Sequence, residues 1–397
     1  MRCQGVIRFE MPEDTLPRDH RARLIWQILQ TLELSGFIAQ AKAVHGQAGR
    51  DVLSPAMLLT LWLYAISVGI GSAREIARRA KSDDAFRWIV GNQDVGHATL
   101  SAFRVGHGTA LEKLMTDVLG VLLHKGLLSL ERVAQDGTRV RASASAPSFR
   151  REATLLECRE QAALHVKAVL ADPDPEATEG ERQARIAAAL DYQRRVEAAI
   201  GTIQTLREEG KEEPRASTTD AEARVMKMPD GGFRPGYNIQ LATAGSELGG
   251  PRTIVGLLVT NSGSDMGSIT PMLEDIKART GQLPNQLLAD AGHAKHSCVE
   301  AATRANVEVI MAIPKREQCA TTPASPEVAA WRERMKTDEA KHAYRARAAL
   351  CELSNAHLEC HHGTADLLVR GIAKVTCVAL LGAIAANILA HATAWLA

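Results

Sequence analysis

The sequence has few aromatic residues and almost no excess of charge of either sign. Only 4% of its 397 residues are Phe, Trp or Tyr, whereas 46% are hydrophobic and 23% are charged. This composition excludes a largely disordered chain, and the length suffices for two or three domains. The 47 basic and 46 acidic side chains leave a formal net charge of +1. Any contact with a polyanion must therefore rely on local basic patches.

The motifs of several common enzyme and metal-binding classes are missing. The chain has no glycine-rich loop of the Walker type and no Gly-x-Ser-x-Gly elbow, which disfavours ATP use and serine hydrolase chemistry. Its seven cysteines include no Cys-x-x-Cys pair, which predicts reduced thiols in a cytoplasm. Two stretches rich in Cys and His, 293–298 and 357–362, lack the paired spacing of a structural zinc site.

Long uncharged runs are scarce, and only Val52–Ala73 and Val375–Ala397 are long enough to span a bilayer. The first contains Pro55 and two glycines, and the second contains Asn387 and His391. We therefore expect buried helices rather than membrane spans. The first residues also lack the apolar run of a signal peptide, so we expect a cytoplasmic protein.

Residues 1–128 have the pattern of short helices. Apolar residues recur at helical spacing through 23–34, 55–68 and 111–123. Ser72 and Glu75 fit a capping box, and Gly91 ends a short segment over 83–90. Such helices resemble a helix-turn-helix assembly, which predicts a DNA-binding domain over 1–128. We expect basic residues here to face phosphates, with an ordinary solvated helical face as the alternative: Arg74, Arg78 and Arg104.

Residues 129–397 mix strand and helix signals. Strands are predicted at 131–142, 237–243, 254–260, 286–290 and 307–313. Helices are predicted at 266–280, 293–305, 327–362 and 367–395, and a helical hairpin interrupts the region at about 147–213. This alternation predicts an α/β domain with a mixed sheet flanked by helices.

Three carboxylates in this region have settings that could bring them together. Asp136 lies on the first predicted strand, followed by Gly137 and near Arg139 and Arg141. Asp290 ends a predicted strand before Ala-Gly-His, and the alternative is that it only caps the next helix. Glu352 lies within helical reach of Tyr344 and Arg347, and the alternative is a surface ion pair. Three converging carboxylates near basic groups suit two-metal phosphoryl chemistry.

Two further carboxylates are weaker candidates. Asp265 is expected to cap the helix that begins near Met266, and Asp220 is expected to make a turn in Ser217–Ala221.

Motifs in order along nearly the whole chain carry a resemblance. They include Gly71-Ser-Ala-Arg, Val133-Ala-Gln-Asp-Gly-Thr-Arg-Val-Arg-Ala-Ser, Asp230-Gly-Gly-Phe-Arg-Pro-Gly-Tyr-Asn, Thr260-Asn-Ser-Gly-Ser-Asp-Met-Gly and Asp290-Ala-Gly-His-Ala-Lys-His. The chain resembles a DDE transposase of a bacterial insertion sequence, in the branch known as the eleven-eighty-two family, whose catalytic core is RNase H-like.

The resemblance implies a role for particular residues. Asp136, Asp290 and Glu352 would be the catalytic metal ligands for Mg²⁺, for which Mn²⁺ can substitute. Tyr344 and Arg347 would belong to a tyrosine–arginine–glutamate signature that contacts DNA, together with Arg139 and Arg141.

The resemblance also implies the reaction and its partners. Activated water cleaves the ends of the element, and the freed 3′-hydroxyl attacks target DNA. Partners would be double-stranded DNA, as terminal inverted repeats and target, and a second copy in a homodimer. The protein would associate with the bacterial nucleoid when bound to DNA. Departures such as His293, where relatives usually have tyrosine, leave two alternatives open: a decayed copy that only binds terminal repeats, and an RNase H-like nuclease without strand transfer.

Overall fold

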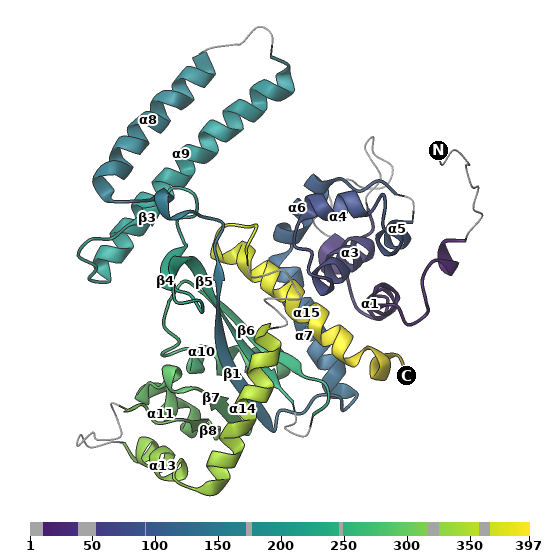
Figure 1. Ribbon diagram of the computed structural model, residues 1–397, viewed down its shortest axis with the longest axis vertical. Helices are drawn as coiled ribbons and strands as arrows, with labels where there is room; N and C mark the ends of the chain where they lie inside the picture. The colour runs from purple at the N-terminus through teal and green to yellow at the C-terminus, as the bar shows by residue number, and fades with distance from the viewer. Residues whose placement is uncertain are drawn as a thin grey trace, which may run out of the picture.

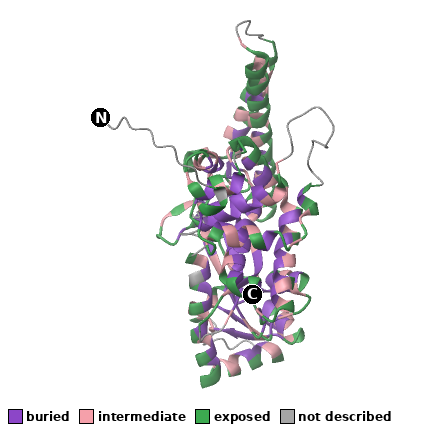
Figure 2. Ribbon diagram, turned by 90° about the vertical axis from the view of Figure 1, so that its right-hand side faces the viewer, coloured by how far each residue is buried: buried purple, intermediate pink, exposed green. Residues whose placement is uncertain are grey.

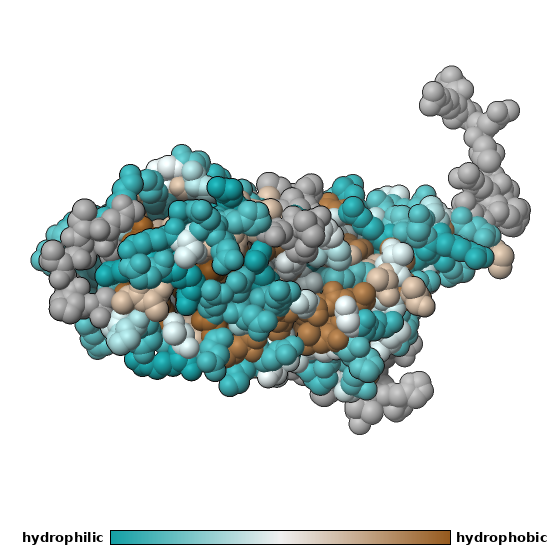
Figure 3. Space-filling model, turned by 90° about the horizontal axis from the view of Figure 1, so that it is seen from below, coloured by the Kyte–Doolittle hydropathy of each residue, from teal (hydrophilic) through white to brown (hydrophobic). Residues whose placement is uncertain are grey.

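The computed structural model describes residues 11–38, 53–91, 93–171, 177–245, 249–315, 325–356 and 366–397. Figure 1 shows a group of short helices near the start of the chain, a sheet flanked by helices, and a helical hairpin that projects from them. Buried residues gather in the body of the molecule, whereas the hairpin is mainly exposed (Figure 2). The surface seen from below is mostly hydrophilic, with hydrophobic residues in smaller areas (Figure 3).

The first part of the chain is helical, as its apolar spacing predicts. Its elements are η1 (Pro12–Asp14), α1 (Arg21–Leu29), α2 (Ser35–Ile38), α3 (Pro55–Ser67), α4 (Ala73–Arg79), α5 (Asp84–Val90), α6 (His97–Gly106) and α7 (Gly108–His124). Helix α3 is buried along most of its length, which explains its uncharged sequence. The indole of Trp62 on α3 donates a hydrogen bond to the Leu100 carbonyl on α6 at 3.0 Å.

Local sequence signals account for the ends of two of these helices. Ser72 caps α4 by accepting from the Glu75 backbone, although the Glu75 side chain contacts arginines and does not complete the capping box. Asp83 caps α5, and Gly91 ends α5 in the left-handed conformation with φ 55°.

A mixed sheet with β1 at its centre forms the second part. Its strands are β1 (Arg132–Arg141), β4 (Arg224–Lys227), β5 (Phe233–Ala244), β6 (Thr253–Thr260), β7 (Gln286–Ala289) and β8 (Glu308–Met311). Strand β1 pairs antiparallel with β5 and parallel with β7. On the far side of β5, β4 and β6 pair antiparallel with it, and β8 pairs parallel with β7. Antiparallel strands therefore lie on one side of β1 and parallel strands on the other.

Helices cover both faces of this sheet. They are α10 (Ile269–Thr280), η3 (Ala291–His293), α11 (His296–Arg304), α13 (Pro326–Arg334), α14 (Asp338–Ala356) and α15 (Ile372–Leu396). Small residues of α14 and Leu350 pack on Ala134, Leu288 and Ile310 of the sheet. Helix α10 lies on the opposite face, where a Cβ on Gly256 would meet the Met272 sulfur at 2.6 Å.

The hairpin is inserted between β1 and β5 and has a small core of its own. It consists of α8 (Glu152–Ala171) and α9 (Glu179–Glu208), and the chain enters and leaves it through η2 (Ala146–Ser148) and the paired strands β2 (Phe149–Arg150) and β3 (Ala216–Ser217). Leu155 packs with Val196 and Ile203 in a cluster separate from the main core. Thr178 and Glu181 form a complete capping box at the start of α9.

Helix α15 is long and apolar enough to cross a membrane by length and composition, but 67% of its most apolar window is buried inside the protein. It packs against β6, α7, α3 and α1. The Asn387 amide accepts from the Ile254 backbone N–H and donates to the Ile254 carbonyl, each at 2.8 Å. These bonds satisfy the backbone beside a register shift between β5 and β6. The apolar character of α15 thus reflects a buried core helix in this structure.

Several element boundaries differ from the sequence-based expectation. The helix expected over 293–305 is divided into η3 and α11, and the one expected from 266 begins at Ile269. The last helix begins at Ile372, after Gly371 with φ 86°, because Asp366 first pairs with the end of β1. The short strands β2, β3 and β4 were not predicted, because they lack a strand-like sequence pattern. Each is extended because it pairs with a neighbouring strand.

Candidate active site

Asp136 lies in the middle of β1 and points toward α14. Side chains alternate along a strand, so Asp136 shares its face with Ala134, which packs on α14. The Asp136 Oδ1 atom accepts from the Gly137 backbone N–H at 2.9 Å. Its side chain is 22% exposed, so the carboxylate is partly enclosed by the protein and still accessible to solvent.

Asp290 follows β7 directly and lies beside Asp136. Strand β7 pairs parallel with β1 in the register Ala134 to Leu288, which puts Asp290 two residues further along, level with Asp136. The Asp290 Oδ1 atom accepts from the Gly292 backbone N–H at 2.8 Å and contacts the His293 ring Nδ1 at 2.7 Å. Asp290 therefore caps the short turn η3 rather than the helix that follows it.

Helix α14 supplies basic and amide groups to Asp136. The Arg347 guanidinium lies 3.6 Å from the Asp136 Oδ2 atom, and the Asn355 amide donates to the same oxygen at 3.3 Å. The guanidinium also lies over the Tyr344 ring, 5.9 Å from its centroid. Residues 344, 347 and 355 share this side of α14 because of their helical spacing.

The two aspartates experience opposite electrostatic effects. Burial raises the pKa of Asp136, while Arg347 and the Gly137 N–H act against it. The His293 hydrogen bond lowers the pKa of Asp290 and outweighs burial. Burial also raises the pKa of the Cys351 thiol on α14, with the charges of Asp136, Arg347, Glu352 and Asp290 acting on it. Cys351 thus lies among the groups of this site.

Glu352 is exposed, one residue beyond buried Cys351 on α14. One residue turns a helix by about 100°, so Glu352 leaves the side of α14 that faces Asp136. Within the described residues, no three His, Cys, Asp or Glu side chains are close enough together to hold a metal ion. The structure thus brings Asp136 and Asp290 together and leaves Glu352 at the rim.

The two arginines that follow Asp136 on β1 contact acidic side chains. The Arg139 guanidinium lies 3.3 Å from Asp265 and also donates to the Gly263 carbonyl. Arg141 pairs with Asp230 at 3.5 Å and with Asp366 at 3.8 Å, and it is half exposed. Arg141 is thus the more accessible of the two.

The three arginines of the helical part differ in accessibility. Arg74 is exposed, and Arg78 is exposed and pairs with Glu75. Arg104 is 6% exposed, donates to the Gly71 carbonyl at 2.7 Å and lies over the Trp62 ring. The expectation that Arg104 faces phosphates is corrected here, because its guanidinium is enclosed and joins α6 to the segment before α4.

The weaker candidate carboxylates have structural partners that their local sequence does not predict. Asp265 does not cap α10, because its side chain accepts from Asn238 at 2.7 Å and from Gln240 at 2.6 Å. Asp220 is buried, and both of its oxygens accept from the Tyr237 hydroxyl at 2.8 Å. The expected turn is present, because the Asp220 N–H donates to Ser217 Oγ at 3.0 Å. The side-chain partners of both aspartates nevertheless lie far away in sequence, on β5, at Arg139 of β1 and at Gly371.

The two stretches rich in Cys and His differ in what the structure describes of them. In the first, 293–298, His293 is fully buried and bonds to Asp290 and Gln240, and no three His, Cys, Asp or Glu side chains of the described residues gather there to hold a metal ion. The second, 357–362, lies outside the described residues.

Sequence reasoning missed three polar residues of this region: Gln240, His293 as a partner of Asp290, and Asn355. Helical spacing from Tyr344 and Arg347 could have found Asn355, which lies eight residues after Arg347. The Asn355 Oδ1 atom is buried and has no hydrogen-bond partner within the described residues. For Gln240 no local signal exists, since its partners are far away in sequence.

Two family models match the chain. Residues 10–105 match the transposase domain family DUF772, and residues 293–390 match a transposase DDE domain. No curated protein and no solved structure matches it. The first match covers the helical part as far as α6, and the second runs from His293 through α14 into α15. Glu352 lies inside the second match, whereas Asp136 and Asp290 lie outside both.

Proposed function

We propose that this chain, which matches two transposase domain families, is a DDE transposase of an insertion sequence that cleaves the ends of its element and joins the freed 3′-hydroxyl to target DNA. The observation that carries the proposal is the adjacency of Asp136 and Asp290 on neighbouring parallel strands, with Arg347 beside them. Asp136 and Asp290 supply oxygen ligands, and Arg347 supplies a positive charge for a phosphate.

The residues at this place suit a hard divalent cation. Their donor atoms are carboxylate oxygens and the Asn355 Oδ1 atom, which has no hydrogen-bond partner among the residues that the structure describes, and oxygen is the ligand that Mg²⁺ prefers. Asp136 and Asp290 would hold Mg²⁺, or Mn²⁺ in its place, and Glu352 would have to turn inward from the exposed side of α14 to join them. Bound ions of this kind stabilise the attacking and leaving oxygens of an in-line displacement.

We propose an RNase H-like core for the sheet. The support is the order β6-β5-β1-β7-β8, in which three antiparallel strands lead into two parallel ones. Asp136 on the central strand and Asp290 after the next parallel strand then occupy adjacent positions. We also propose a domain boundary at 128/129, in the segment between α7 and β1.

DNA is the substrate of a transposase, and we propose where this chain contacts it. Arg74 and Arg78 on the exposed side of α4 would contact the terminal inverted repeats, in the way that basic side chains neutralise phosphates. Arg141, Tyr344 and Arg347 would contact the strand being cut, and Arg139 would support them from its pair with Asp265. Two copies would hold the two ends of the element, on the DNA of the bacterial cytoplasm.

The test replaces each proposed ligand with its amide in the full chain. Asp136→Asn, Asp290→Asn and Glu352→Gln are each expected to reduce Mg²⁺-dependent cleavage of end DNA to background while end binding persists. Asp338→Asn is the matched control, because Asp338 is fully exposed at the start of α14. Retained cleavage in one variant would remove that residue from the ligand set.

The same assay separates the two alternatives. A wild-type chain that binds end DNA and never nicks it with Mg²⁺ or Mn²⁺ would be a decayed repeat-binding protein. A chain that hydrolyses DNA without joining a 3′-hydroxyl to a target would be a nuclease. The exposed position of Glu352, away from the two aspartates, is the observation that favours the first of these.

A further inference from the structure

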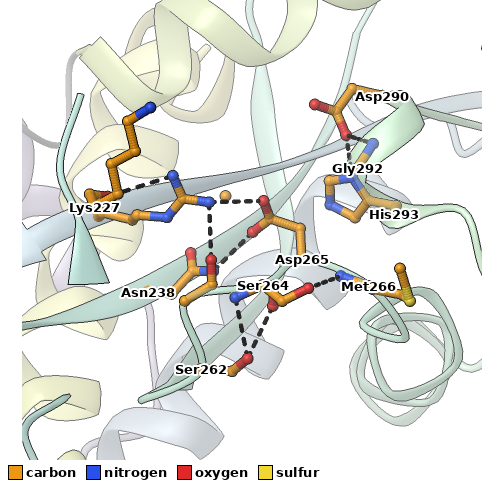
Figure 4. A network of polar contacts seen from close by, with 12 residues as sticks. Lys227, Asn238, Ser262, Ser264, Asp265, Met266, Asp290, Gly292 and His293 are labelled. Atoms are coloured by element: carbon orange, nitrogen blue, oxygen red, sulfur yellow. Dashed lines mark hydrogen bonds and ion pairs between the residues drawn. The ribbon is translucent and has the colours of Figure 1, made fainter. Parts of the chain in front are cut away.

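A cluster of buried polar side chains lies on the face of β1 and β5 opposite α14. Gln135, Asn238 and Gln240 point to this face, and each is at most 1% exposed. Asp265, from the loop before α10, reaches into the same cluster, and the fully buried His293 joins it to Asp290. Figure 4 shows Asp265 directed toward Asn238, with Asp290 and His293 nearby. Buried polar networks whose hydrogen bonds are satisfied make a core rigid and specify one arrangement of its side chains.

The bonds of the cluster determine how the Gln240 amide is oriented. Its Nε2 atom donates to Asp265 Oδ1 at 2.6 Å, and an ionised carboxylate can only accept. The Gln240 Oε1 atom is therefore directed the other way, where it accepts from Gln135 at 3.2 Å and meets the His293 ring Nε2 at 3.1 Å. Asp265 thus decides which end of the Gln240 amide faces His293.

The His293 ring is held at both nitrogens. Its Nε2 contacts Gln240 and its Nδ1 contacts Asp290 Oδ1 at 2.7 Å, so the ring cannot turn without losing one of these bonds. The same Asp290 oxygen also accepts from the Gly292 backbone. One oxygen of Asp290 is thereby held inside the protein, and the other points away from His293 (Figure 4).

Gly137, the residue after Asp136, leaves the room that this arrangement needs. A Cβ at Gly137 would come within 2.0 Å of Gln240 Nε2 and 2.6 Å of Asp265 Oδ1. Any side chain there would push both groups off β1. Gly137 therefore leaves space for Gln240, which contacts His293, the hydrogen-bond partner of Asp290.

We propose that Gln240, oriented by Asp265, is a positioning residue that acts through His293 to aim the free oxygen of Asp290 at a metal ion. The inference rests on the proposed ligand role of Asp290. Groups behind a metal ligand commonly alter metal affinity by about 10- to 100-fold. Gln240 lies two contacts from Asp290 and three from the ion, and it touches neither metal nor DNA.

The experiment compares Gln240→Met with Gln286→Met in the full chain. Methionine has the length of glutamine but neither of its hydrogen-bonding groups. Gln286 lies at the other end of β7, where it bonds to Arg132 and Glu308, so it controls for the loss of a part-buried amide. The readouts are affinity for end DNA and the Mn²⁺ concentration that half-saturates cleavage, measured with the metal alone as variable.

We expect Gln240→Met to raise the half-saturating Mn²⁺ concentration about 10-fold, the lower end of the range for groups bonded directly to a metal ligand, with unchanged affinity for end DNA. Gln286→Met is expected to leave both unchanged. An equal effect of the two variants, or none at Gln240, would overturn the positioning role while leaving the proposed function intact.

A reciprocal pair keeps the test valid if Gln240→Met folds poorly. Gln240→Glu alone opposes two carboxylates and is expected to impair metal response. In the double variant with Asp265→Asn, the new amide at position 265 can donate to the new carboxylate at position 240, which is the reverse of the wild-type bond. The half-saturating Mn²⁺ concentration should then return most of the way to that of the wild type. Failure of this rescue, with the double variant folded, would contradict orientation of Gln240 by Asp265.

A spectroscopic readout separates this inference from the proposed function. In a chain with ¹⁵N-labelled histidine, the ring signals of His293 are those that His293→Gln removes. These signals are expected to shift in Gln240→Met and not in Gln286→Met, whether or not the protein cleaves DNA. Unshifted signals would overturn the link between Gln240 and His293. If the wild type does not cleave DNA but the His293 signals do shift in Gln240→Met, the proposed function would be overturned and the link between Gln240 and His293 would remain.

Discussion

Asp136 and Asp290 lie side by side, yet they differ in how readily they hold a negative charge. Burial raises the pKa of Asp136, whereas the His293 hydrogen bond lowers the pKa of Asp290. As pH falls, Asp136 is therefore protonated before Asp290. Arg347 limits this tendency because its guanidinium faces Asp136 directly. A cation bound between the two would favour the ionised form of both.

His391 makes the stability of the fold depend on pH. It is buried on α15 beside the Thr253 hydroxyl, and burial lowers its pKa below the ordinary 6.5. The unfolded chain then binds a proton more readily, so the stabilisation is present above pH 6.5 and is lost as pH falls through the lowered value. Each unit of difference in pKa corresponds to about 1.4 kcal/mol.

We expect His391→Gln to lose less unfolding free energy than the wild type between pH 7.5 and pH 5, because glutamine bonds to Thr253 but does not titrate in this range. Urea unfolding at the two pH values measures this difference. His124→Gln, at an exposed position of α7, should retain the wild-type dependence. Parallel pH profiles for wild type and His391→Gln would rule out His391 as the source.

At the scale of single residues, the sequence predicted Asp136 and Asp290 on strands that turn out to be neighbours, because strand signals and a following Gly or Ala-Gly are local. It could not predict that Arg104 is enclosed, since its partner Gly71 is 33 residues away. The role of Gln240 was equally out of reach, because His293 follows it by 53 residues. Contacts between residues that are distant in sequence cannot be predicted from local sequence patterns.

At the scale of elements, α14 shows what a helical pattern predicts and what it does not. The spacing of Tyr344 and Arg347 with Glu352 predicted a shared face. The buried side of α14 is set by Ala343, Ala346 and Leu350, which pack on the sheet, and this places Cys351 inward and Glu352 outward. A shift of one residue along a helix turns a side chain by about 100°, which is enough to move it from the site to the exposed rim. The spacing of residues in the sequence does not determine the facing side of a helix more finely than this.

The five principal strands were predicted within about four residues. Four of them are rich in β-branched residues or alternate in polarity, whereas β7 is a short apolar run that follows Pro284. The helical hairpin was also predicted, and it spans 152–171 and 179–208. Strand β4 was missed because Arg224–Lys227 has no such pattern and forms by pairing with β5.

Glu75 on α4 restrains the two arginines that follow it. Its carboxylate accepts from Arg78 at 2.7 Å and from Arg79 at 2.8 Å, and these bonds lower its pKa to about 2. If α4 contacts DNA, Glu75→Gln should free the Arg78 guanidinium and increase affinity for end DNA, whereas Arg79 keeps its ion pair with Asp83 at 3.7 Å. The dependence of affinity on salt should steepen by about 1 for each added phosphate contact.

Fluorescence anisotropy with end DNA over a range of salt concentrations checks this prediction. Glu160→Gln on exposed α8 changes the net charge by the same amount and serves as the control. An increase no larger than that of the control would show that α4 does not lie against DNA.

At the scale of the whole molecule, α15 joins the helical part to the sheet. One continuous hydrophobic core includes residues of α3 and α7, the sheet and most of α15. Leu381 is 1% exposed within it. The two parts therefore share their stabilisation, although the DNA-binding and catalytic roles proposed for them are separate.

Leu381→Ala is expected to lower the free energy of unfolding by about 2–5 kcal/mol, as for other buried leucines. Because the core is shared, amide hydrogen exchange should accelerate together in α3 and in β6, as measured by mass spectrometry. Leu396→Ala, at the exposed end of α15, should change neither. Acceleration in β6 alone would mean that the two parts unfold independently.

The place of the hairpin in the chain also sets the order in which the sheet can form on the ribosome. The roughly 90 residues that separate β1 from β5 take about 5–18 s to synthesise. During that interval the hairpin, whose contacts are local, can fold, while β1 has neither neighbour available. The nascent strand that carries Asp136 thus spends seconds with two open edges, which makes it the segment of the sheet most exposed to wrong pairing and to chaperones.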